Sequence, residues 1–159
     1  MTIRHVMLIV IAAAVTITSI AAARPSAMKQ GVVTTSQSAT PSPTAPFTFA
    51  PVTAGKLKRD SGTETCRWPD PRVVVRDGQR IEIQYNAVCT DKRKLGSLTT
   101  RSRIECVNAG NGYHVGAGTW TVVRGTGQYA GVTGGGRTGN VWLDRGPWSG
   151  RFEGVLTLP

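Results

Sequence analysis

The densest run of glycine in the chain lies between residues 125 and 139 and reads GTGQYAGVTGGGRTG. Seven of these fifteen residues are glycine. Glycine adopts positive φ without strain and lets another segment of backbone approach closely. The segments on both sides of the run have strand character, and no helix follows it to supply oriented amides to a phosphate. The run therefore predicts a strand-to-strand corner rather than a ligand-cradling loop.

Alternation of apolar and polar residues with a period of two, which is typical of half-buried antiparallel strands, extends from Phe47 onward. One predicted strand places five residues on a single face: Ile81, Ile83, Tyr85, Ala87 and Cys89. A second places Leu98, Ile104 and Cys106 opposite Arg101, Arg103 and Glu105. Further strands are expected at 47–52, 73–76, 112–124, 137–144 and 148–158. Seven or eight short strands without a persistent helical face predict an all-β domain, which either closes as a barrel or packs as a sandwich.

The pair Asp77-Gly78 lies between two apolar runs and predicts a two-residue hairpin turn, in which both residues adopt positive φ. Residues paired across such a turn have numbers that add to 155, and Cys66 and Cys89 satisfy this register. We therefore favour a Cys66–Cys89 disulfide. A Cys89–Cys106 bond is the alternative, and it would require a different turn between the next two strands.

The first 23 residues have the order of a secretory signal peptide: a basic start with Arg4, an apolar run from Val6 to Ala23, and a final Ala-Ala-Ala. An uncleaved membrane anchor is the alternative. We expect cleavage, a secreted or extracytoplasmic location, and no membrane-spanning segment in the mature chain. Residues 24–45 are rich in Ser, Thr, Pro and Ala, and we expect a disordered linker there. The folded domain is expected to cover residues 46–159.

Without residues 1–23 the chain carries a net charge of +9, because that segment holds one arginine and no acid. A basic exported protein can associate weakly with anionic envelope polymers. Local clusters of cations occur at Lys92-Arg93-Lys94 and at Lys56-x-Lys58-Arg59. Aromatic residues do not alternate with basic ones, so we expect no specific binding of nucleic acid.

Residues that could support catalysis are scarce. The mature chain has one histidine, His114, and its cysteines lack the ligand spacing of a zinc site, so we expect neither a metal nor another cofactor. Asp144 and Glu153 are expected to be solvated and to point outward. The candidate ligand contacts are large aromatic side chains, namely Trp120, Trp142 and Tyr85, while catalytic residues cannot be assigned.

The segment Gly125 to Gly134 resembles the G-T-G-x-[YF]-x-G-x-x-G segment of allene oxide cyclase and dirigent-like barrels, which include exported bacterial members. The similarity extends over residues 112–159. It implies a closed antiparallel barrel of about eight strands, in which a short turn packs Tyr129 between strands. It also assigns to the scaffold Gly125, Gly127, Tyr129, Gly131 and Gly134. Plant members cyclise an epoxide fatty acid or guide phenoxy-radical coupling with residues outside this segment, so the resemblance implies no catalytic residue here.

Three functions are consistent with these features. The first is non-enzymatic binding of an apolar or aromatic small molecule inside the barrel. The second is a cofactor-free isomerase or cyclase, or a dirigent-like protein, which rests on the resemblance alone. The third is a basic interaction protein of the cell envelope. A sealed, fully packed interior would exclude the first two.

Overall fold

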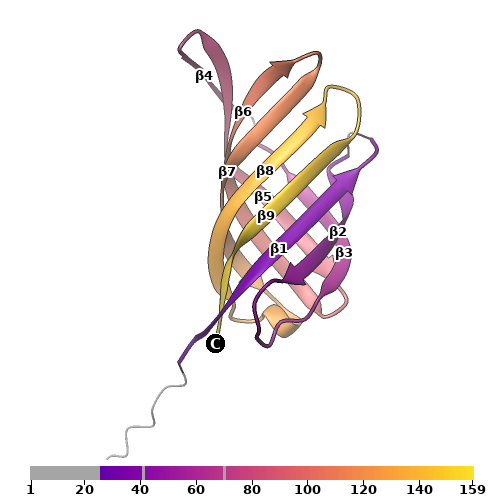
Figure 1. Ribbon diagram of the computed structural model, residues 1–159, viewed down its shortest axis with the longest axis vertical. Coiled ribbons are helices and arrows are strands. Elements are labelled where there is room, and N and C mark those ends of the chain that lie inside the picture. Colours follow the sequence, from indigo (N-terminus) through magenta and orange to yellow (C-terminus); the bar gives the residue numbers. More distant parts are fainter. Residues whose placement is uncertain (1–25, 41, 70) are drawn as a thin grey trace, which may run out of the picture.

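The computed structural model describes residues 26–40, 42–69 and 71–159, and for Tyr85 it describes the backbone alone. The expected signal peptide lies outside these residues. The described residues form nine strands, whose arrangement is drawn in Figure 1. Their bounds are β1 Met28–Ser38, β2 Thr44–Pro51, β3 Asp60–Arg67, β4 Arg72–Arg76, β5 Gln79–Arg93, β6 Gly96–Gly110, β7 Tyr113–Gly125, β8 Thr133–Leu143 and β9 Trp148–Leu158. A short 3₁₀ turn, η1, spans Gly127–Tyr129.

The strands form one antiparallel sheet in the order β3-β2-β1-β9-β8-β7-β6-β5-β4, and pairing of β3 with β5 closes it into a barrel of eight strands. Strand β4 stays outside the ring and pairs with the first part of β5 as a projecting hairpin. This hairpin and the β8–β9 turn lie at one end of the barrel, which we call the open end (Figure 1). The opposite end, with η1 and the C-terminus, is the closed end. The predicted fold class is confirmed.

The expected linker at residues 24–45 is wrong in its extent, because β1 lies within it and β2 begins at Thr44. Strand β1 pairs with both β2 and β9 and is a full member of the barrel. Its inward side chains include Gln30, Thr34 and Ser36, which are polar but buried. Composition alone therefore made a barrel strand resemble a flexible tether, and the folded domain begins well before residue 46.

The hairpin at Asp77-Gly78 has the predicted turn, with φ of 51° and 76°. Arg76 pairs with Gln79, and the same register continues in β3, where Cys66 pairs with Cys89. These two cysteines form the favoured disulfide. Cys106 is a buried free cysteine, so the alternative Cys89–Cys106 bond does not form.

A β-bulge between Gln84 and Ala87 corrects one predicted face of β5. Gln84 pairs with Ile104 and Ala87 pairs with Ser102, so an extra residue interrupts the alternation. Asn86 at the bulge has a φ of 140°. As a result, Ile81 and Ile83 lie on the opposite side of the sheet from Ala87, although both isoleucines are buried.

Large side chains fill the closed half of the barrel. The core there consists of Val32, Phe47, Phe49, Leu57, Leu98, Trp120, Tyr129, Val132, Phe152, Leu156 and Leu158. Tyr129 lies in η1, is 0% exposed, and packs edge-on against Phe49 at 5.7 Å between ring centroids. Its hydroxyl donates to Asp60 Oδ2 and accepts from Gln128 Nε2. The glycine run is thus a corner between β7 and β8 that brings an aromatic plug under the barrel.

Candidate functional site

A cavity of about 290 Å³ opens at the end of the barrel away from Tyr129. Strands β3, β5, β6, β8 and β9, the β1–β2 connection, the residues after β3 and the β8–β9 turn form its walls. The main side chains around it are Trp68, Glu82, Gln84, Ile104, Trp142 and Trp148. The interior is therefore packed at the closed end and hollow at the open end.

Two inward-facing glycines keep this half of the barrel open. A Cβ on Gly116 would lie 3.0 Å from Ile104 Cγ2 and 3.3 Å from Trp142 Cζ3. A Cβ on Gly150 would lie 2.6 Å from Asn140 Oδ1. Because these two glycines have no side chain, the neighbouring Ile104, Trp142 and Asn140 side chains have room to lie against the barrel wall.

Trp142 and Trp148 are direct register partners on β8 and β9, and both line the cavity. The Trp142 ring stacks on the His114 imidazole with centroids 5.3 Å apart and planes 9° apart. His114 donates from Nε2 to Asp144 Oδ1 at 2.5 Å. Trp142 is thus held in place from the rim by the histidine, while Trp148 Nε1 is buried without a hydrogen-bond partner.

On the opposite wall, Glu82 of β5 pairs directly with Cys106 of β6. Burial, with a smaller contribution from the Glu82 carboxylate, raises the pKa of the Cys106 thiol to about 11. Arg80 contacts Glu82 at 2.6 Å between Nη1 and Oε1, in an exposed ion pair. Cys106 is therefore almost entirely a neutral thiol at physiological pH, which disfavours a nucleophilic role.

A buried cluster of charges lies in the middle of the barrel. Asp91 Oδ2 accepts a hydrogen bond from Arg93 Nη2 at 2.5 Å. The Arg93 guanidinium also lies over the rings of Phe49 and Tyr129, at 4.2 and 4.6 Å from Cζ to the ring centroids. Glu64 is 3% exposed, and its Oε2 has no partner. Burial first and then the Asp91 carboxylate raise the pKa of Glu64 to about 7.

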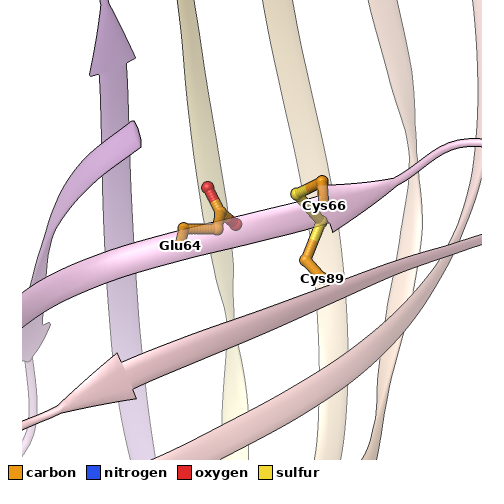
Figure 2. A group of neighbouring side chains, drawn as sticks. All are labelled: Glu64, Cys66 and Cys89. Carbon is orange, nitrogen blue, oxygen red and sulfur yellow. A yellow bond between two sulfur atoms is a disulfide. The ribbon is translucent and has the colours of Figure 1, made fainter. Parts of the chain in front are cut away.

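Glu64 and Cys66 lie two residues apart on the same face of β3, and the disulfide links Cys66 to Cys89 on β5 (Figure 2). One carboxylate oxygen and the two sulfurs lie within 4.8 Å of one another, the spacing of metal ligands. Because the sulfurs are bonded to each other, neither offers the thiolate that binds a metal ion. Cys66 lines the cavity, whereas Glu64 is not among its lining residues.

The structure separates the aromatic residues that the sequence suggested. Trp142 lines the cavity, but Trp120 is 4% exposed in the packed core and donates from Nε1 to the Arg137 and Glu153 carbonyls. The side chain of Tyr85 lies outside the described part of the structure. Asp144 is exposed at the rim, and Glu153 is exposed and paired with Arg151.

Sequence reasoning missed Glu82 and Gln84 as cavity residues. Their inward orientation depends on the bulge that follows them in β5, whereas uninterrupted alternation gave the interior face to Ile81 and Ile83. Trp68, between β3 and β4, was also missed. Its position two residues after Cys66 was the available signal.

Searches against protein-family models, curated proteins and solved structures find no match for this chain. Among residues 26–40, 42–69 and 71–159, no helix combines the length and the apolar character needed to span a bilayer.

Proposed function

We propose that this chain is an exported barrel that binds a small apolar or aromatic molecule in its open half without transforming it. The observation that carries the proposal is the cavity of about 290 Å³ lined by Trp68, Trp142 and Trp148. This volume is close to the lower limit of ordinary ligand pockets, about 300 Å³. Export is supported by the Cys66–Cys89 disulfide, which is typical of oxidising compartments.

The charges around the cavity favour an uncharged ligand over an anion. Glu82 and Asp144 are its acidic lining residues, and no Lys, Arg or His lines it among the described residues. A ligand carboxylate would approach these acids without a cation to bind it. This arrangement gives no support to a substrate of the fatty-acid type, which the resemblance to allene oxide cyclase would imply.

A cofactor-free isomerase or dirigent-like protein is the second candidate, and the interior acid Glu64 is the observation that favours it. A carboxyl with a pKa of about 7 can donate or accept a proton near neutral pH. A general acid must reach its substrate, however, and Glu64 does not line the cavity. Binding without chemistry therefore accounts better for the geometry.

The test is a titration of the purified protein with N-phenyl-1-naphthylamine, a neutral aromatic dye that fluoresces in apolar sites. We expect saturable binding of one dye per chain, and weaker binding for Trp142→Ala and Trp148→Ala. Val155→Ala is the control, because Val155 of β9 is 46% exposed and is not among the residues that line the cavity. Native mass spectrometry of the exported protein would reveal a co-purified ligand. Absence of saturable dye binding would contradict the proposal.

A further inference from the structure

A group of exposed cations lies at the closed end of the barrel, opposite the cavity. They lie at the start of β1, in the β2–β3 loop, and at the β5–β6 turn, all of which reach this end (Figure 1). The exposed cations are Lys29, Lys56, Lys58, Arg59, Lys92 and Lys94. The two sequence clusters thus come together, although Arg93 leaves its cluster by turning into the core.

The acids of the same region point into the barrel. Asp60, Glu64 and Asp91 are 7%, 3% and 6% exposed. The described surface of the closed end therefore presents these cations without neighbouring exposed Asp or Glu side chains. A carboxylate beside a lysine would weaken the attraction of that lysine to a polyanion. Because the acids point inward and the cations outward, the positive field at the closed end is stronger.

Two apolar side chains project from the same surface. Val52 directly follows β2 and is 63% exposed, and Leu95 lies in the β5–β6 turn next to Lys94 and is 46% exposed. Exposed apolar side chains near the end of the barrel, in segments that also carry lysines, fit the boundary between lipid headgroups and acyl chains. A soluble polyanion would use the lysines but would gain little from Val52 and Leu95.

Both loops are fixed by buried contacts. The Gln30 side chain donates from Nε2 to the carbonyls of Thr53 and Leu57, and its Oε1 accepts from the Leu57 amide at 2.9 Å. The Leu95 amide donates to Asp60 Oδ2, and the Leu95 carbonyl accepts from the Gln128 amide. Because these loops are ordered beforehand, binding does not have to supply their ordering entropy.

We propose that the closed end docks on the surface of an anionic lipid bilayer. The lysines bind headgroup phosphates, Val52 and Leu95 enter the interface, and the cavity faces the aqueous phase. The proposal is independent of what the cavity binds.

The experiment is co-sedimentation of the mature protein with phosphatidylcholine vesicles that contain or lack phosphatidylglycerol. We expect binding only with phosphatidylglycerol, and its loss as salt is raised. Lys56→Gln/Lys58→Gln/Lys94→Gln should lower the affinity about tenfold or more, since each lysine near an anionic surface contributes several-fold. The matched control removes the same charge at the open end, with Arg72→Gln/Arg80→Gln/Arg145→Gln.

A second pair of variants separates a bilayer from a soluble polymer. Val52→Ser/Leu95→Ser should weaken vesicle binding severalfold, whereas Val75→Ser, at an exposed site on β4, should not. Equal loss in the two charge-matched triples would overturn the proposal, as would absence of binding to the anionic vesicles. Binding to polyphosphate as tight as to vesicles, with Val52→Ser/Leu95→Ser unaffected, would identify an anionic polymer instead and also overturn it.

Discussion

Glu64 and Asp91 are direct register partners on β3 and β5, and both carboxyls point into the barrel. One guanidinium, that of Arg93, contacts Asp91 at 2.5 Å. Burial of the Glu64 carboxyl first, and then the neighbouring Asp91 carboxylate, raise the pKa of Glu64, so Glu64 holds its proton to higher pH than an ordinary carboxyl would. The interior of the barrel is therefore electrostatically sensitive to pH.

Glu64→Gln should remove a pH dependence of stability. In the unfolded chain Glu64 has its ordinary pKa of 4.5, whereas in the folded chain its pKa is about 7. Between these two pH values only the folded chain keeps the Glu64 proton, so the free energy of unfolding falls as pH rises. A shift from 4.5 to about 7 corresponds to about 3 kcal/mol lost across this window. Urea denaturation from pH 4.5 to 8 should show a steeper decline for wild type than for Glu64→Gln, with the variant more stable at pH 8.

Glu153→Gln is the matched control for this effect, because Glu153 is an exposed acid on the outer face, paired with Arg151. Its pH profile should follow that of wild type. Parallel profiles for wild type and Glu64→Gln would show that Glu64 does not carry the raised pKa.

Replacement of Arg93 should be among the most damaging substitutions in the chain. Arg93→Met keeps much of the side-chain volume but leaves Asp91 and Glu64 without a cation, and breaking a buried ion pair costs about 3–5 kcal/mol. Arg93→Lys keeps the charge but loses the planar stacking on Phe49, so its cost should be smaller, about 1–2 kcal/mol. Equilibrium denaturation at pH 7 measures both. Equal stability of the two variants would show that the ion pair does not contribute.

The sequence predicted those features of the fold that short-range chemistry determines. Asp77-Gly78 defines a hairpin register, and extending this register along the chain is sufficient to place Cys66 opposite Cys89. The glycine run around Tyr129 likewise indicated a corner rather than a ligand loop. In each case the local backbone preference and the global fold agree.

Features that depend on distant partners could not be predicted in this way. Strand β1 has buried polar residues, and Gln30 is acceptable inside only because the backbone of residues 53 and 57 binds its amide. The bulge at Asn86 changes which side of β5 faces inward, and alternation in the sequence does not reveal an inserted residue. The cavity depends on Gly116 of β7 meeting Trp142 of β8, and on Gly150 of β9 meeting Asn140 of β8, and these contacts exist only once the strands are assembled.

The cysteines should react in an order set by burial. In native protein at pH 7.5, Cys106 should resist iodoacetamide, because a pKa of about 11 instead of 9 lowers the thiolate fraction about a hundredfold. Unfolded protein without reductant should gain one adduct, and reduced, unfolded protein should gain three, as there are three cysteines in the chain. Intact mass spectrometry gives these counts. Rapid labelling of the native protein would contradict the buried position of Cys106.

Adding one methyl group to the wall should close part of the cavity. Gly116→Ala places its Cβ 3.0 Å from Ile104 and 3.3 Å from Trp142, so these side chains must move toward the cavity. We expect weaker dye binding and a stability loss of about 1–3 kcal/mol from overpacking. Gly139→Ala on the adjacent strand is the matched control, because the nearest atom to its Cβ is the Gly116 carbonyl oxygen at 4.0 Å. That variant should keep wild-type dye affinity and change stability by less than about 0.5 kcal/mol. If the two alanine variants bind the dye equally well, the dye does not occupy this cavity.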